Sequence, residues 1–277
     1  MINILTDSTA DLPESIIKTF QIGVLPMYVQ IDGITYKDGI NISAQTLFDR
    51  VRKTGEYPTT SAPSPLDFER FFDRKSPSIY IGVSSVLSST FRNAQVASKD
   101  MGSSYIDLID SKSISTGYGQ IVLQAAEWRN EGMSFEDLRV KIRQLVHKAR
   151  GIFILDSLDY LYHGGRCSAV EHIFSSILKI RPILNILPNG TLGVLQKIRG
   201  SREKAIDALW NYFKTQIHLL DLKRIFLMHI DSDDEINYLK EKIINFGIHV
   251  QIEIGRVGCV LATHSGPKPL GIAYTVK

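Results

Sequence analysis

Serine and threonine side chains gather at the ends of predicted strands or just ahead of predicted helices, where they are suited to bind a ligand. The residues concerned are Thr60 and Ser61 in PTTSAPSP (58–65), Ser88 and Ser89 in SSVLSST (84–90), and Ser8, which follows Asp7, in TDSTAD (6–11). Hydroxyl groups and the unpaired N–H groups of helix N-termini together suit a small anion such as a carboxylate or a phosphate. Hydroxyls in these places also cap helices. The pattern therefore predicts either an anion site or a set of helix caps.

His264 is the histidine most suited to a role in such a site. It lies in THSGPKPLG (263–271), ahead of a glycine-containing turn and a final apolar run. Such a histidine is either a structural hydrogen-bonding residue or, paired with Ser88 or Ser61, the base of a Ser–His hydrolase. Both interpretations stay open at this point.

Several signatures of cofactor and metal chemistry are absent from the sequence. There is no GxSxG motif, no HExxH motif and no GxxxxGK[ST] phosphate loop, and Gly117 and Gly119 lack the third glycine of a dinucleotide fingerprint. The acidic run 231–235 is interpreted as the start of a helix, because acidic side chains are favourable there. Neutral hydroxyls are not a metal-binding set. The sequence predicts neither a cofactor nor a metal.

The elements that must position these side chains alternate between strands and helices in the first half of the chain. Strands are predicted at 2–7, 23–31, 79–83 and 105–110, and helices after Pro13, after Ser43, and at about 66–74, 114–130 and 135–149. This alternation predicts an α/β unit with a mostly parallel sheet and flanking helices. Ligands of such sheets bind beyond the carboxyl ends of the strands, which is where several of the hydroxyls fall.

The second half predicts a different arrangement. Strands are expected at 151–156, 224–231, 249–254 and 270–276, with helices at 201–217 and 234–246. Asn189-Gly190 stands between two strand-like runs and predicts a hairpin. We therefore expect two lobes: an N-terminal α/β lobe over residues 1–150 and a C-terminal α+β lobe with antiparallel pairing over 151–277.

Composition narrows the class of protein. The 277 residues carry 32 Lys+Arg against 29 Asp+Glu, and the basic residues are scattered apart from the cluster Lys197, Arg199, Arg202 and Lys204. A nucleic-acid partner is not expected from that distribution. The first residues lack the pattern of a signal peptide, and no apolar run approaches the about 18 residues of a membrane span. We expect a cytoplasmic protein without stable membrane insertion, whose two cysteines are reduced thiols.

An ordered set of motifs makes the whole chain resemble the DegV family of bacterial fatty-acid-binding proteins. The segments are TDSTADLP, PTTSAPSP, VSSVLSSTFRNA, YLYHGGRCS, RPILNILPNGTLGVLQKIRGSREKA and HSGPKPLGIAY. The resemblance implies a long-chain fatty acid enclosed between an α/β lobe and an α+β lobe. It also implies a partner, the ATP-binding subunit of fatty acid kinase, which phosphorylates the carboxylate to give an acyl phosphate for phospholipid synthesis.

The resemblance also implies roles for individual residues. Thr60, Ser61 and Ser88 would bind the carboxylate, with Ser89 and His264 beside them; Arg166 would help build the head-group region with Ser8 and Asp7; and Arg199 and Arg202 would dock the kinase. Ser89 departs from the family pattern, which has glycine there, and adds a donor or narrows the head-group pocket. Lys268 and Pro269 replace part of a commonly glycine-rich motif and stiffen it.

A fatty-acid carrier is consistent with simple energetics. Prolines on both sides of Thr60 limit the freedom of the backbone, which lowers the ordering cost of binding. Burial of about 14 methylenes at ~0.8 kcal/mol each offers about 11 kcal/mol before the cost of association. Candidate tunnel residues are Ile22, Leu25, Met27, Phe153, Leu155, Phe174, Ile177 and Leu178. A Ser/His hydrolase of acyl esters or thioesters and a lipid-sensing regulator without a kinase partner remain the alternatives.

Overall fold

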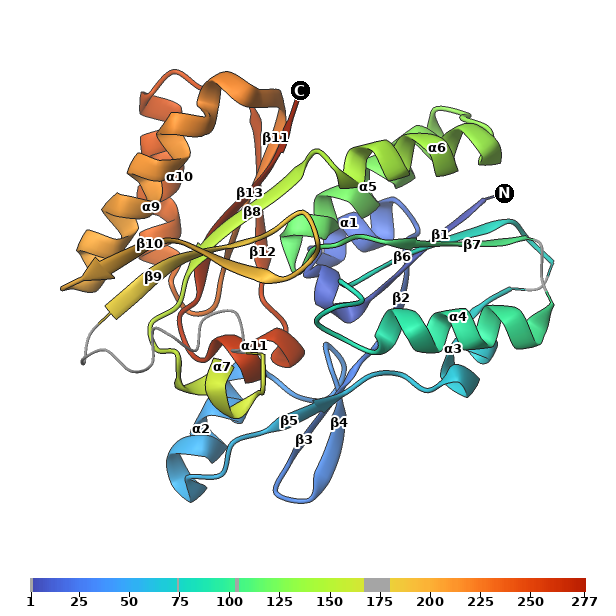
Figure 1. The fold of residues 1–277 in the computed structure, drawn as a ribbon, viewed down its shortest axis with the longest axis horizontal. Helices are drawn as coiled ribbons and strands as arrows, with labels where there is room; N and C mark the ends of the chain where they lie inside the picture. The colour runs from blue at the N-terminus through green and yellow to red at the C-terminus, as the bar shows by residue number, and fades with distance from the viewer. Residues whose placement is uncertain (1, 74, 103–104, 167–179) are drawn as a thin grey trace.

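The first half of the chain forms a parallel sheet covered by helices on both faces (Figure 1). The computed structural model describes residues 2–73, 75–102, 105–166 and 180–277. The strands are β1 (Asn3–Asp7), β2 (Gly23–Leu25), β6 (Ser78–Gly82) and β7 (Ile106–Asp110), in the order β2-β1-β6-β7 with parallel pairing throughout. The helices are α1 (Glu14–Thr19), α5 (Thr116–Asn130) and α6 (Phe135–Val146) on one face, and α3 (Pro65–Phe71) and α4 (Thr90–Met101) on the other.

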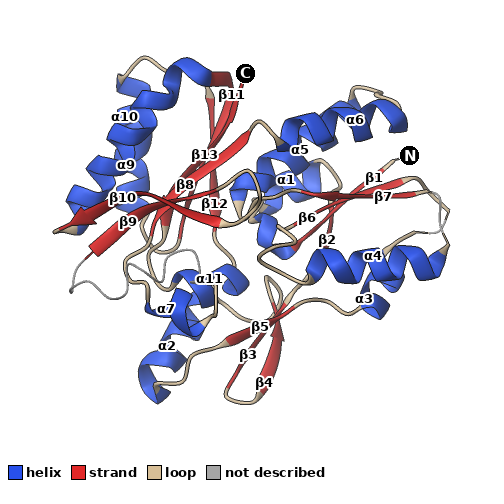
Figure 2. Ribbon diagram, viewed as in Figure 1, coloured by secondary structure: helices blue, strands red, loops and turns tan. Residues whose placement is uncertain are grey.

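The second half forms a six-stranded mixed sheet. Its strands are β8 (Ala149–Ile154), β9 (Ile180–Ile186), β10 (Leu192–Arg199), β11 (Leu220–His229), β12 (Gln251–Arg256) and β13 (Leu270–Val276), in the order β10-β9-β8-β13-β11-β12. The pairs are antiparallel except β11 with β12, which are parallel and joined through α10 (Asp233–Asn245). Helices α9 (Arg202–Gln216) and α10 cover one face (Figure 2). The predicted fold class, an α/β lobe followed by an α+β lobe, is confirmed.

Helix α5 lies between the two large sheets and contacts both. Most of its side chains from Thr116 to Ala126 are buried, which is typical of a helix packed on more than one side. Gln120 Nε2 donates to the carbonyl oxygens of Tyr274 and Arg150, at 3.1 and 3.3 Å. Glu127 forms ion pairs with Lys223 and Arg224 of β11. The two halves therefore share one core around α5.

A third, small antiparallel sheet lies beside the two large ones. It contains β3 (Tyr28–Ile31), β4 (Ile34–Lys37) and β5 (Thr59–Ser61), in the order β4-β3-β5. The prediction of one strand over 23–31 was wrong, because the chain divides around Pro26 into β2 and β3 of different sheets. Proline has no N–H group to donate to a sheet. The predicted hairpin turn is confirmed: Asp32 and Gly33 have φ of 53° and 72°.

Three helices pack against this small sheet and the end of the mixed sheet (Figure 2). They are α2 (Ala44–Thr54), α7 (Asp159–His163) and α11 (Cys259–Ser265), and single turns of 3₁₀ helix occur at Ser8–Ala10 and Ile217–Leu219. Ser43 Oγ accepts from Thr46 N at 3.1 Å, as the predicted cap of α2. Over the ranges described above, none of the helices has the length and apolar character needed to span a bilayer.

Candidate functional site

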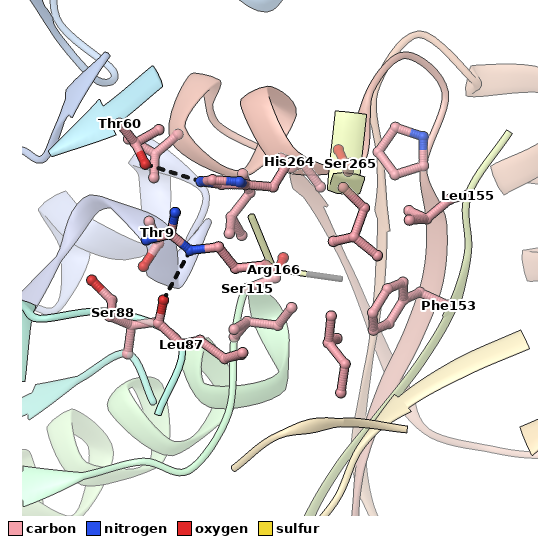
Figure 3. A pocket seen from close by; sticks show the side chains of 18 of the residues that line it. Thr9, Thr60, Leu87, Ser88, Ser115, Phe153, Leu155, Arg166, His264 and Ser265 are labelled. Carbon is pink, nitrogen blue, oxygen red and sulfur yellow. Dashed lines mark hydrogen bonds between the residues drawn. The ribbon is translucent and has the colours of Figure 1, made fainter. Parts of the chain in front are cut away.

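A mostly apolar pocket lies where the mixed sheet, the small sheet and the parallel sheet meet (Figure 3). The space between its walls is about 820 Å³, a figure that includes the part open to solvent. The apolar lining is Met27, Val83, Leu87, Ile114, Phe153, Leu155, Leu161, Leu192, Met228, Val257, Val260, Leu261 and Pro269. The polar lining is Thr9, Thr60, Ser88, Ser115, Arg166, His264 and Ser265. The pocket can therefore hold an apolar ligand that has a polar group.

Strand β5 brings one hydroxyl of the PTTSAPSP segment (58–65) into this pocket. Thr60 pairs with Val29 of β3 and lines the pocket, and its Oγ1 lies 2.9 Å from His264 Nε2. Successive side chains of a strand point to opposite faces. Ser61 is exposed and lies outside the described lining, as does Thr59. Ser64, and not Thr60, caps helix α3.

The last turn of α11 supplies His264, whose Nδ1 is inaccessible to solvent and has no hydrogen-bond partner among the described residues. Burial, and secondarily the charge of Arg166, lowers the pKa of His264 to about 4, so the ring is neutral near pH 7. Gly164 makes room for this ring, since a Cβ there would come within 2.2 Å of Nδ1. The ring is held between Gly164 and Thr60.

The hydrogen bonds around His264 indicate which nitrogen carries the proton. A buried N–H group without a partner is rarer in proteins than an unpaired acceptor. Because Nδ1 is the unpaired atom, we assign the proton to Nε2, which then donates to Thr60 Oγ1. In this tautomer the hydroxyl hydrogen of Thr60 is available to another acceptor.

Arg166 and Ser88 lie at the same polar end of the pocket (Figure 3). Arg166 Nε donates to the carbonyl oxygen of Leu87 at 3.3 Å, and its Nη1 donates to that of Gly164 at 2.7 Å. Ser88 Oγ lies 2.8 Å from Thr90 Oγ1. The structure thus brings Thr60, Ser88, Arg166 and His264 to one pocket.

Ser89, the departure from the family pattern, has a different position. It is exposed, is the N-cap residue of α4 and lies outside the described lining. The Ser89 side chain is therefore not among the groups that line the pocket. Lys268 and Pro269 are the second departure from the family pattern. Pro269 lines the pocket, whereas Lys268 is exposed and has a φ of 56°.

Asp7 lies behind the pocket wall, fully buried at the end of β1. It accepts hydrogen bonds from Tyr80 and Tyr118 hydroxyls at 2.9 and 2.8 Å, and from the N–H groups of Val83 and Thr9, both at 3.1 Å. Burial, together with Asp7, raises the pKa of both tyrosines well above its usual value. Asp7 therefore fixes Thr9 and Val83, which line the pocket.

Ser8 also acts from outside the pocket. Its Oγ donates to Asp38 Oδ2 at 2.8 Å and accepts from the N–H group of Met27 at 3.1 Å. Met27 lines the pocket, whereas Ser8 lines a separate cleft. Ser8 thus holds a lining residue in place.

Two carboxylates that the sequence analysis did not identify hold the first turn of α11. Asp38 Oδ1 accepts from the N–H group of Cys259 at 2.7 Å, and Asp11 Oδ1 accepts from that of Gly258 at 2.8 Å. Burial raises the pKa of both carboxyl groups. Their partners are more than 200 positions away in the sequence, so no local pattern could reveal them; a φ of 49° at Asp11 is their one local peculiarity.

Ser115 is a further lining residue that the sequence analysis missed. It donates to Asp11 Oδ2 at 2.5 Å, and it has a φ of 53° just before α5. Thr9 was also missed, although it belongs to the TDST segment that drew attention to Asp7 and Ser8. Proximity to a motif residue was the available signal for Thr9.

The residues predicted to line a tunnel or to dock a kinase have different locations in the structure. Met27, Phe153 and Leu155 line the pocket, Ile22 and Leu25 lie in the cores of the parallel sheet, and Phe174, Ile177 and Leu178 lie outside the described residues. Arg199 is exposed on the edge strand β10. Arg202 is only 12% exposed and pairs with Glu235 at 3.0 Å and with Asp156 at 3.6 Å. Its side chain therefore belongs to an internal network.

Two further kinds of chemistry, metal binding and reaction at a cysteine thiol, were considered for the residues that the structure describes. They contain no group of three or more His, Cys, Asp or Glu side chains arranged to hold a metal ion. Burial raises the pKa of Cys259 to about 12, so its thiol stays protonated and unreactive. Cys167 lies outside the described residues.

Comparisons with known proteins agree with this architecture. Residues 1–277 match the family described as "Uncharacterised protein, DegV family". A DegV domain-containing protein of Caldanaerobacter subterraneus is 35% identical over 286 residues, covering 100% of this chain and 99% of that protein. A solved structure from Thermus thermophilus, titled as fatty acid binding of a DegV family protein, is 28% identical with a TM-score of 0.91, covering 99% of each chain. The fatty acid kinase B3 protein of Streptococcus pneumoniae, solved with linoleic acid, shares the fold at 22% identity and a TM-score of 0.88, covering 100% of each chain. The chain belongs to the DegV family.

Proposed function

We propose that this protein binds a long-chain fatty acid, with the carboxylate at the Thr60–His264 end of the pocket and the acyl chain among the apolar side chains. The observation that carries this proposal is a mostly apolar pocket whose polar lining includes a neutral histidine 2.9 Å from a threonine hydroxyl, Thr60 Oγ1. The Thermus relative, described as binding fatty acid, supports it. No cofactor has a part in this proposal.

In the proposed complex, Thr60 donates to the carboxylate while His264 donates to Thr60. This order follows from the tautomer assigned above, because Thr60 Oγ1 then accepts from Nε2 and keeps its own hydrogen for the ligand. A hydroxyl–carboxylate hydrogen bond is charge-assisted and stronger than a neutral one. Arg166 adds positive potential nearby, although two of its nitrogens already donate to main-chain carbonyls. The carboxylate is thus oriented without a bidentate ion pair.

We further propose that the bound carboxylate is presented to a separate ATP-binding kinase subunit, which converts it to an acyl phosphate. This finer step rests on the resemblance of the ordered motifs to the binding subunits of fatty acid kinase. Arg199, exposed beside Lys197 on β10, suits the docking role better than Arg202, which has intramolecular partners. A regulator that binds the same lipid without a kinase is the competing possibility, and a kinase-coupled assay separates the two.

Hydrolysis of acyl esters is a weaker candidate. Ser88 Oγ is bonded to Thr90 Oγ1, and His264 Nε2 faces Thr60 instead of a serine. A histidine whose pKa is about 4 is also a poor general base near pH 7. These contacts favour a non-catalytic binding protein.

Native mass spectrometry of the purified protein, followed by denaturing extraction, tests the proposal. The expected result is a bound or readily accepted long-chain fatty acid. Thr60→Val should lower the affinity by about tenfold or more, because it removes a hydrogen bond to a charged group. Thr59→Val is the matched control, since that exposed hydroxyl on the same strand lies outside the lining. Refusal of both palmitate and oleate by the wild-type protein would overturn the proposal.

A further inference from the structure

The mixed sheet closes one side of the pocket with two large side chains that meet over a glycine. Phe153 on β8 and Met228 on β11 both pair directly with Gly271 on the central strand β13. Directly opposed residues in antiparallel strands point to the same face. Phe153 and Met228 both line the pocket. They therefore form a continuous floor across three neighbouring strands.

Gly271 is what allows the two side chains to approach each other. A Cβ at this position would come within 2.2 Å of Met228 Cε and 2.9 Å of Phe153 Cβ. The methyl group of Met228 thus occupies the space that a side chain at 271 would fill. The shape of this floor therefore depends on the absence of a side chain at Gly271 and on the length of the Met228 side chain.

The next row of the same face belongs to the core and not to the pocket. Two residues further along, Gly151, Ala273 and Phe226 are opposed in the same way. Ala273 and Phe226 pack in the buried cluster that contains the side chains of α5. The pocket consequently stops at the Phe153–Met228 row, because α5 covers the row behind it.

The position of this floor relative to the polar residues gives it a specific meaning. In Figure 3, Phe153 and Leu155 lie on the opposite side of the pocket from Thr60 and Ser88. A fatty acid with its carboxylate at Thr60 would direct its terminal methyl group away from those hydroxyls. We infer that Phe153 and Met228 receive the end of the acyl chain and set the longest chain that the pocket accepts. This inference rests on the fatty-acid binding proposed above.

The rule for chain length follows from the packing. A chain that ends short of the floor leaves an unfilled gap, and one that is too long must displace Phe153 or Met228 from a close-packed core. Each further methylene that gains apolar surroundings is worth about fourfold in affinity. Smaller side chains in the floor should therefore move the preference toward longer acids.

Competition between saturated acids tests the assignment. Dodecanoic, hexadecanoic and icosanoic acids are offered together to each purified variant, and the bound fractions are measured by native mass spectrometry. Phe153→Leu and Met228→Ala should each raise the bound ratio of icosanoic to hexadecanoic acid by about fourfold or more. Phe226→Leu is the matched control, because it makes the same change as Phe153→Leu in the row beneath α5 and should leave the ratio within about twofold.

The outcomes separate this inference from the binding proposal. Fatty acid bound by every variant with unchanged ratios would overturn the floor assignment and leave the binding proposal standing. An equal shift in Phe226→Leu would also overturn it, since the effect would then come from loosened packing. Failure of the wild-type protein to bind any of the acids would overturn both. Phe153→Leu retains most of the apolar bulk, so it carries the test if Met228→Ala does not fold.

Discussion

Asp7 and the Thr60–His264 pair are both polar groups beside the same pocket, but they differ in how their hydrogen bonds are satisfied. Both oxygens of Asp7 accept bonds from neighbouring hydroxyl and N–H groups. The tautomer assigned to His264, by contrast, leaves the hydroxyl hydrogen of Thr60 available to an acceptor in the pocket. Buried polar groups are normally paired within the protein. The difference teaches that Asp7 serves the scaffold, whereas the pair is arranged for something that enters the pocket.

Asp7→Asn should give the largest effect and should act on stability. The amide group would place an NH₂ donor against donors that now face a carboxylate oxygen, such as the Tyr80 hydroxyl and the Val83 N–H. Donors left unsatisfied in a buried site cost about 1–3 kcal/mol each. We expect the free energy of unfolding, measured by urea denaturation, to fall by about 2–6 kcal/mol.

Thr60→Val is the control for this comparison. It removes a hydroxyl that bonds to one neighbour at a partly buried position. Because only one donor, His264 Nε2, loses its acceptor, the free energy of unfolding should fall by about 1–3 kcal/mol, which is less than in Asp7→Asn, while the affinity for fatty acid drops. Similar losses of stability in Asp7→Asn and Thr60→Val would contradict the division into scaffold and ligand site.

The second-largest expected effect is the contribution of His264 to the pH dependence of the free energy of unfolding. Its pKa is lowered in the folded state from 6.5 to about 4. Between these two values the unfolded chain binds a proton that the folded protein does not, so stability falls as the pH falls. The contribution is fully present above pH 6.5 and amounts to about 3 kcal/mol at most.

Comparison of the wild-type protein with His264→Gln by urea denaturation across this pH range isolates that contribution. Burial raises the pKa of Asp11 and of Asp38, so protonation of those carboxyl groups favours the folded state as the pH falls. Both groups are present in both proteins, so their contribution cancels in the difference. The stability difference should shrink from pH 6.5 toward pH 4. Parallel stability curves would show that the ring is not held neutral by its surroundings.

Much of the fold was accessible from the sequence because its signals are local. Alternation of strands and helices, the Asp32-Gly33 and Asn189-Gly190 turns, and the Ser43 cap each depend on residues within a few positions. The predicted strand 23–31 failed for a non-local reason: the segments on either side of Pro26 were taken into different sheets. Periodicity cannot tell which sheet a strand will join.

The site was predictable in part for a related reason. The motif resemblance identified Thr60, Ser88, Arg166 and His264, which the structure brings to one pocket. It could not separate Thr60 from Ser61, a distinction made by the alternation of side chains along β5. Asp11 and Asp38 were missed because their roles depend on contacts with α11, far away in the chain. Contacts of that kind exist only after folding.

The basic residues show the same contrast between internal and external partners. Arg202 Nε donates to Glu235 Oε1 at 3.0 Å, and its Nη2 donates to Ser232 Oγ at 3.1 Å. Arg202→Glu would set a carboxylate against Glu235 and Asp156, with a loss of stability of about 3 kcal/mol. A reduced kinase response in that variant would therefore say little about docking.

Arg199→Glu isolates docking from folding. Because Arg199 is exposed on an edge strand, its substitution should change the free energy of unfolding by no more than about 0.5 kcal/mol and leave fatty-acid affinity unchanged. In a coupled assay with the kinase subunit, the rate of acyl phosphate formation should fall at low protein concentration and recover as the concentration of the kinase rises, because a surface charge acts mainly on association. The fall should also weaken with added salt. An unchanged rate under all of these conditions would place the kinase contact elsewhere on the molecule and leave the pocket assignment intact.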